Sequence, residues 1–107
     1  MAALTTQRIG TTGLVATYAS AGGSGDTIEA AANVFLHVKN GGGASINVTV
    51  AVPGTEYGVA RADAVVAVAA SAETFIEIPR ELADSSDHRV HVTYSASSSV
   101  TVAALGL

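Results

Sequence analysis

The chain contains no cysteine and no tryptophan, and only 2 of its 107 residues are proline. The absence of cysteine excludes disulfide bonds and thiolate metal sites. Aromatic residues make up only 5 % of the chain, and much of the 49 % apolar fraction is alanine. We therefore expect a thin hydrophobic core built from valine, isoleucine and leucine with few rings.

Charged residues are also scarce, at 13 % against about 25 % in typical soluble domains. The five basic residues are spread from Arg8 to Arg89, and the net charge is −4. Nucleic-acid binding depends on clustered basic side chains, so we expect no nucleic-acid partner. A surface with so few charges favours self-association or docking on another protein.

Long hydrophobic runs are missing as well. The longest apolar run, from Ala64 to Ala70, is too short to cross a bilayer. The first ten residues lack the basic region and apolar stretch of a secretory signal. These features predict a protein made in the cytoplasm that has no membrane partner.

The strongest pattern that is present lies between Phe35 and Val52. Apolar and polar residues alternate through 34–39 and again through 45–52, as they do in half-buried strands. Between the two runs, Asn40-Gly41-Gly42-Gly43 supplies residues that tolerate a chain reversal. The segment therefore predicts a β-hairpin.

The rest of the chain continues this pattern, and its length suits a single domain over residues 1–107. Pro79 ends one strand, and a helical turn is expected around Leu82. The spacing of about seven short strands predicts an all-β fold, a single small antiparallel β-sandwich with an immunoglobulin-like or jelly-roll strand order. After the hairpin, the expected strands cover 64–68, 74–78, 89–95 and 100–105.

The first part of the chain is less regular. Glycines break residues 1–25 into short extended pieces, and we expect an extended N-terminal arm that becomes ordered on a partner. Asp26-Thr27-Ile28-Glu29 could begin a helical turn with Asp26 as its N-cap and Glu29 in the capping-box position. An extended bridge is an equally good interpretation of these four residues.

The sequence contains no convincing catalytic or metal-binding motif. His88 and His91 follow Asp84 and Asp87, but residues three apart on a strand point to opposite faces, so we expect ordinary surface side chains. His37 is expected to be a surface imidazole. No serine lies in a nucleophile elbow, and the glycine cluster at 22–25 lacks the lysine of a phosphate loop. We expect neither enzymatic activity nor a cofactor or metal.

Tyrosine and arginine anchor many protein interfaces, and they occur in two places here. Tyr18 lies in the arm, with Arg8 in the same segment. Tyr57 lies in the long loop 55–63, with Arg61 nearby. These four residues are the candidate interface, although each tyrosine could equally pack on the sandwich with only its hydroxyl at the surface.

Three segments, Phe35–Gly43, Met1–Thr5 and Val100–Leu105, give the chain a resemblance to a family of small virion proteins. It resembles the capsid decoration (cement) proteins of tailed bacteriophages. The resemblance implies a non-enzymatic β-sandwich on the capsid exterior of the virion, where it ties neighbouring major capsid protein subunits together. It also implies a homo-oligomer, often a trimer.

Two alternatives remain. A head-to-tail connector or tail subunit could use the same sandwich. A carbohydrate-binding module would need a platform of exposed aromatic rings, which is hard to build from three tyrosines without tryptophan.

Overall fold

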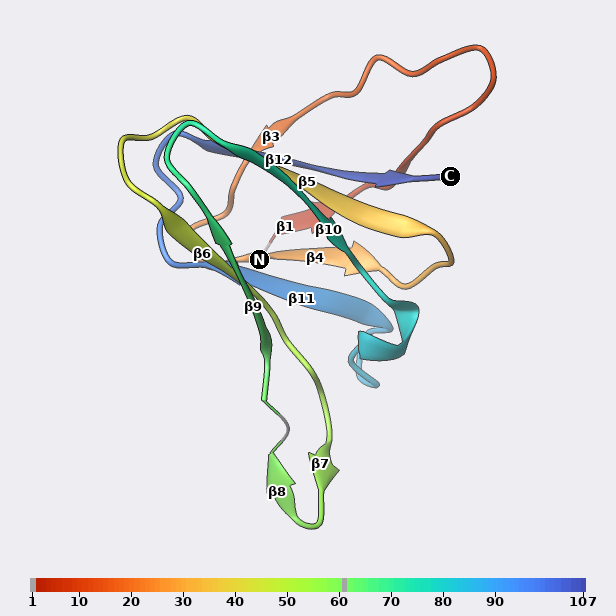
Figure 1. Ribbon diagram of the computed structural model, residues 1–107. Coiled ribbons are helices and arrows are strands. Elements are labelled where there is room, and N and C mark those ends of the chain that lie inside the picture. Colours follow the sequence, from red (N-terminus) through yellow and green to blue (C-terminus); the bar gives the residue numbers. More distant parts are fainter. Residues whose placement is uncertain (1, 61) are drawn as a thin grey trace.

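The computed structural model describes residues 2–60 and 62–107, and its regular structure is almost all β (Figure 1). A single short 3-10 helix in these ranges, η1 (Arg80–Leu82), matches the helical turn expected around Leu82. No helix in the described ranges is long and apolar enough to cross a membrane. The strands are β1 (Ala2–Leu4), β2 (Gln7–Arg8), β3 (Ala19–Ser20), β4 (Asp26–Glu29), β5 (Val34–Asn40), β6 (Ile46–Val50), β7 (Thr55–Glu56), β8 (Val59–Ala60), β9 (Ala64–Val68), β10 (Glu73–Glu77), β11 (Arg89–Tyr94) and β12 (Val100–Gly106).

Two sheets pack into a sandwich, which confirms the all-β prediction (Figure 1). Sheet A has the strand order β1-β4-β11-β6-β9, and sheet B has the order β10-β5-β12-β2, with β3 also paired to β12. Most neighbours are antiparallel, but β1 runs parallel to β4 and β2 runs parallel to β12. Both sheets are therefore mixed, because the N-terminal strands join them in parallel.

The prediction of a β-hairpin between Phe35 and Val52 is wrong. Both runs form strands, but β5 lies in sheet B and β6 lies in sheet A. The glycine segment 41–43 thus carries the chain from one sheet to the other. The apolar residues of the two strands are buried, and they face each other across the core instead of lying side by side in one sheet.

Three connections between the sheets lie at the same end of the sandwich, at 41–45, 69–72 and 95–99 (Figure 1). The buried side chain of Asn40 ties the first two together. Its amide bonds four backbone groups, which are the carbonyl oxygens of Ala44 (2.9 Å), Val68 (3.2 Å) and Ala69 (3.2 Å) and the N–H of Gly42 (3.0 Å).

The core between the sheets is aliphatic, as the composition predicts. The molecule measures 43 × 35 × 19 Å, and the smallest dimension suits two sheets stacked about 10 Å apart. Tyr94 packs against the edge of this core. The buried core residues from sheet A are Ile28, Ile46, Val48, Val50, Val68, Val90 and Val92, and those from sheet B are Val34, Leu36, Val38, Ile76, Val100, Val102 and Ala104.

The expected N-terminal arm does not extend freely from the domain. Strand β1 pairs with β4, and β2 and β3 both pair with β12. Between them, Gln7 closes a loop, because its Nε2 donates to the Thr17 carbonyl (2.7 Å) and its Oε1 accepts from the Thr17 N–H (2.8 Å). The segment thus adds strands to both sheets, and its loop at 9–16 leaves Val15 94 % exposed.

The segment Asp26–Glu29 takes the extended alternative, as strand β4 between β1 and β11. The Asp26 side chain is fully buried, and its Oδ2 accepts hydrogen bonds from the Tyr94 hydroxyl (2.8 Å) and the Gly22 N–H (3.2 Å). A methyl group on Gly22 would lie 2.5 Å from the Gly25 carbonyl oxygen, so only glycine permits this close approach. The two donors offset part of the cost of burying a carboxyl group.

The pairing of the Tyr94 hydroxyl with Asp26 has a consequence for stability at alkaline pH. Burial raises the pKa of the Tyr94 hydroxyl above its ordinary value, and the hydrogen bond to Asp26 raises it further. The unfolded chain releases this proton near pH ~10 while the folded chain keeps it, so the free energy of unfolding falls above that pH, by up to about 1.4 kcal/mol per pH unit.

We therefore expect Tyr94→Phe to be less stable than the wild type at about pH 8 and to lose less stability between about pH 9.5 and 11.5. Urea unfolding at stepped pH measures both curves, and the difference between them isolates the contribution of the Tyr94 hydroxyl. Parallel curves through the alkaline range would contradict this account.

Candidate functional site

The structure describes three of the four residues that the sequence assigns to an interface, while Arg61 lies outside the described residues. The Arg8 guanidinium donates to the carbonyl oxygens of Ala32 (3.2 Å) and Leu107 (3.1 Å), so it holds the C-terminal end of the chain. Tyr18 is half-buried beside sheet B, whereas Tyr57 is 98 % exposed in the turn between β7 and β8. The structure therefore does not bring the two tyrosines together.

The histidines and acidic residues of 84–91 form a polar surface turn. The Ser86 N–H and hydroxyl donate to Asp84 Oδ1 (2.8 and 2.7 Å), and these bonds hold the pKa of the Asp84 carboxyl below its ordinary value. His91 Nε2 lies 2.9 Å from Asp87 Oδ2. Over residues 2–60 and 62–107, no three His, Cys, Asp or Glu side chains gather as metal ligands would.

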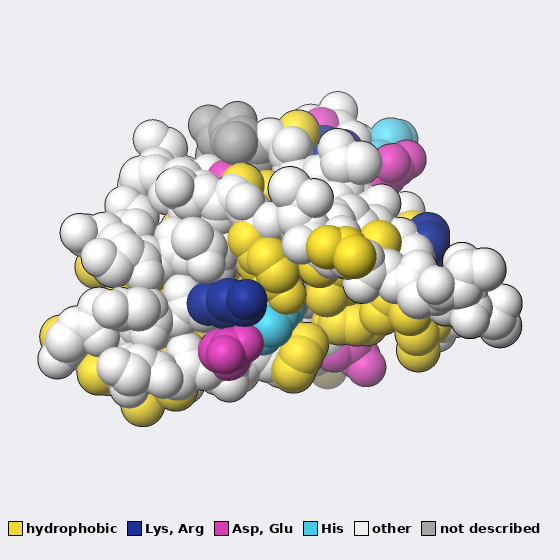
Figure 2. Space-filling model, turned by 90° about the horizontal axis from the view of Figure 1, so that it is seen from above, with side chains coloured by type: hydrophobic (Ala, Val, Ile, Leu, Met, Phe, Trp, Pro, Cys, Tyr) yellow, Lys and Arg dark blue, Asp and Glu magenta, His cyan; other side chains and the backbone are white. Residues whose placement is uncertain are grey.

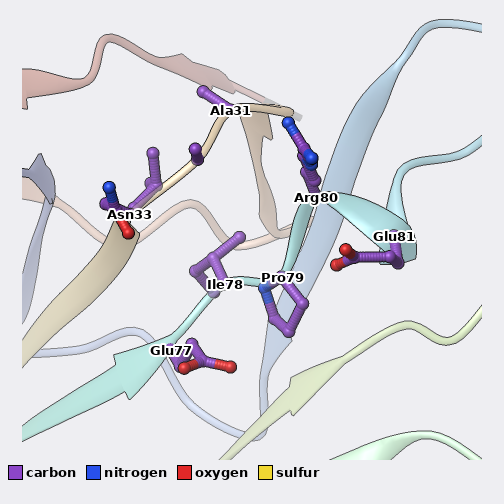
Figure 3. Close-up of a pocket in the computed structure, with 9 residues that line it drawn as sticks. Ala31, Asn33, Glu77, Ile78, Pro79, Arg80 and Glu81 are labelled. Atoms are coloured by element: carbon purple, nitrogen blue, oxygen red, sulfur yellow. The ribbon is translucent and has the colours of Figure 1, made fainter.

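A pocket of about 250 Å³ lies between the β4–β5 connection and the segment that follows β10 (Figure 3). Its charged side chains are Glu77, at the end of β10, and Arg80 and Glu81, in the segment that follows β10. Figure 3 shows Arg80 and Glu77 on opposite sides of Pro79. The lining residues include no nucleophile beside a base, which is the pairing that nucleophilic catalysis uses.

The outer face of sheet B carries a group of rings that we call the aromatic patch, defined as Tyr18, Phe35, His37 and Phe75. Phe75 lies opposite His37 in the β10–β5 register. Their rings stack with centroids 4.1 Å apart and planes 14° apart. Phe35 meets Phe75 edge to face at 5.7 Å, and Tyr18 meets His37 edge to face at 5.4 Å. Three of the five phenylalanine and tyrosine rings, together with the His37 imidazole, thus lie on one surface.

Polar contacts fix this patch. The Tyr18 hydroxyl lies 2.6 Å from His37 Nδ1, and the Lys39 Nζ lies 3.9 Å from the centroid of the Tyr18 ring. His37 is only 6 % exposed, so the prediction of a surface imidazole is wrong. The sequence could not show this burial, because Tyr18 and Phe75 come from segments far from His37 in the chain.

Tyr18, His37 and Glu73 follow the order hydroxyl, imidazole, carboxylate, which also occurs in catalytic relays. His37 Nε2 lies 3.0 Å from Glu73 Oε1, but the direction of approach does not make an aligned hydrogen bond, and the Glu73 side chain is 60 % exposed. The contacts instead fasten Tyr18, and with it the N-terminal segment, to the face of sheet B.

The patch is open to contact from outside. Phe75 is 64 % exposed although it is a large ring on a sheet face. Figure 2 shows hydrophobic side chains gathered on one face, beside a basic, an acidic and a histidine side chain. Exposed aromatic surface of this kind marks contact sites on folded proteins. The alternation through 34–39 does put Phe35 and His37 on the outer face, but only the pairing of β10 with β5 adds Phe75.

The predicted contact loop 55–63 contains the β7–β8 hairpin, which extends away from the sandwich (Figure 1). Tyr57 and Gly58 form its two-residue turn with φ angles of 54° and 76°, as a type I′ turn requires. Tyrosine is a poor residue for this conformation, at a cost of about 1 kcal/mol. A strained position that presents a ring almost wholly to solvent suggests a role in contact.

Two surfaces therefore carry exposed aromatic rings, the aromatic patch on sheet B and the Tyr57 tip of the hairpin. Their geometry suits binding to another macromolecule. Comparison of the chain with protein-family models, with curated proteins and with solved structures found no match.

Proposed function

We propose that this chain is a structural subunit of a tailed-bacteriophage virion that decorates the outer face of the capsid and bridges neighbouring major capsid protein subunits. It acts by binding and not by catalysis. The observation that carries the proposal is the presence of exposed rings on two separate surfaces of one sandwich, at Phe75 and at Tyr57.

A bridging subunit has to hold two neighbours at the same time. Exposed aromatic side chains supply much of the binding energy at protein interfaces, because a large apolar area is buried at a small entropic cost. The hairpin tip extends away from the sandwich (Figure 1), while the aromatic patch lies on the outer face of sheet B. Two weak contacts on one chain reinforce each other through effective concentration when both neighbours belong to one shell.

The remaining surface is compatible with this role. On the outer face of sheet A, strand β6 and the adjoining end of β11 carry small uncharged side chains, namely Asn47, Thr49 and Thr93. Packing such a face against a neighbour costs little, because few charges have to be desolvated. The net charge of −4 suits the outside of a capsid better than the DNA-lined inside.

The proposal predicts saturable binding to capsids. Purified protein is mixed with phage heads that lack it, and the bound fraction is measured by co-sedimentation over a range of concentrations. We expect binding that saturates at a fixed number of copies per head. A protein that stays in the supernatant at every concentration would contradict the proposal.

Carbohydrate binding is a second candidate, favoured by the exposed Phe75 ring on the sheet face. A glycan array probed with the folded protein tests it. Binding to one class of glycan that is lost in Phe75→Ser would support this candidate over the capsid role, whereas no binding would remove it.

A further inference from the structure

Strand β9 forms one edge of sheet A, and the direction of its backbone groups follows from its neighbour β6. On the far side of β6, the Ser95 N–H donates to the Asn47 carbonyl (2.9 Å) and the Ala51 N–H donates to the His91 carbonyl (2.9 Å). The backbone N–H and C=O groups of the odd-numbered residues of β6 therefore point toward β11. Because the direction of these backbone groups alternates along a strand, those of its even-numbered residues point toward β9.

The register then shows which backbone N–H and C=O groups of β9 have no partner in β6. Val48 lies opposite Val66 and Ile46 lies opposite Val68, so the even-numbered residues of β9 bond to β6. Val65 and Ala67 direct their N–H and C=O groups away from the sheet. In the part of the chain that the structure describes, β6 is the only strand that pairs with β9.

This edge lacks the usual protection against pairing. Natural proteins guard exposed edge strands with charged residues, proline or bulges. At the β10 edge of sheet B, the residues that face outward are Glu73, Phe75 and Glu77, and two of them are charged. Residues 64–72 carry no charge and no proline, and Val65 is 59 % exposed.

We propose that β9 pairs with β9 of a second copy of this chain, antiparallel about a two-fold axis. With Val65 opposite Ala67 of the second copy, each of the two residue pairs exchanges two backbone hydrogen bonds, so the edge is complementary to itself. Val66 then lies beside its own symmetry mate, and this half-buried side chain becomes covered. The two five-stranded sheets become one sheet of ten strands.

Charge decides which edge a second copy can pair with, and it favours β9 over β10. Two chains with a net charge of −4 repel each other, and pairing through β10 would bring together the glutamates of both edges. Pairing through β9 avoids this repulsion, because residues 64–72 carry no charged side chain. The dimer does not depend on the capsid role, and it differs from the trimer that the resemblance implies.

Sedimentation equilibrium tests the pairing in solution, over about 1–300 μM protein, a range that brackets micromolar affinities. The wild type should approach twice its 10.6 kDa chain mass. Ala67→Pro removes an N–H that the fold does not use, and an edge strand tolerates proline at such a position. We expect this variant to dimerise roughly tenfold more weakly or worse, whereas Ala67→Thr, which keeps the N–H, dimerises like the wild type.

Hydrogen exchange of the wild type supplies a readout that needs no variant. The amides of Val65 and Ala67 should be protected at high protein concentration and exchange rapidly on dilution, while the amide of Val66 stays protected at both. A wild type that is monomeric or trimeric over the whole range would overturn the proposal. Rapid exchange of Val65 and Ala67 at high concentration, or a folded Ala67→Pro variant that dimerises like the wild type, would overturn it too.

Discussion

Replacing Asn40 with alanine is expected to lower the free energy of unfolding by about 2–4 kcal/mol. The Asn40 side chain is 2 % exposed, and it bonds backbone groups in two of the three connections that cross between the sheets. In the variant, water cannot easily reach those groups to replace the amide. Total stability is only about 5–15 kcal/mol for a domain of this kind, so the melting temperature should fall by roughly 10–20 °C.

Asn47→Ala is the matched control. Asn47 lies on β6 with an exposed side chain, and its loss should change stability by no more than about 0.5 kcal/mol. Urea unfolding followed by circular dichroism measures both variants. If Asn40→Ala is as stable as Asn47→Ala, Asn40 does not fasten the connections and this part of the account is wrong.

Replacing Tyr57 with asparagine is expected to separate binding from stability. Asn-Gly is the preferred pair for a type I′ turn, so the hairpin should keep its shape, and the protein should be as stable as the wild type or more stable by about 0.5–1 kcal/mol. The exposed ring is lost. If Tyr57 anchors the contact with the capsid, affinity for heads should fall roughly 30-fold, which corresponds to about 2 kcal/mol.

Tyr57→Phe is the control for this experiment, because it keeps the ring and the backbone strain and loses only the hydroxyl. It should bind heads within about threefold of the wild type, a difference of less than 1 kcal/mol. Co-sedimentation measures affinity, and thermal unfolding measures stability. Unchanged binding by Tyr57→Asn would show that the hairpin tip is not a contact, even if the wild type binds.

Much of the fold follows from local patterns. Alternation through 34–39 and 45–52 locates β5 and β6, and alternation through 89–95 locates β11. The assignment of strands to sheets could not be predicted in the same way. A hairpin and a crossing between two sheets both bury alternate residues. The pairings that distinguish them here join β5 to β10 and β12, which come much later in the chain.

Only part of the candidate site, likewise, could be predicted from the sequence. Tyr57 could be chosen from its residue type and its loop, since a loop between strands lies at the surface. The aromatic patch could not be assembled from the sequence, because it needs the pairing of β10 with β5 and the return of Tyr18 over sheet B. The burial of the Asp26 carboxyl could not be predicted either, because its partner Tyr94 lies 68 residues away in the chain.

The number of copies in a purified particle tests the central proposal most directly. Quantitative mass spectrometry of phage particles, with the major capsid protein as internal standard, gives this number. A decoration protein follows the symmetry of the shell and should be present in on the order of hundreds of copies. Roughly six to twelve copies would indicate a connector, and complete absence from the particle would contradict a structural role in the virion.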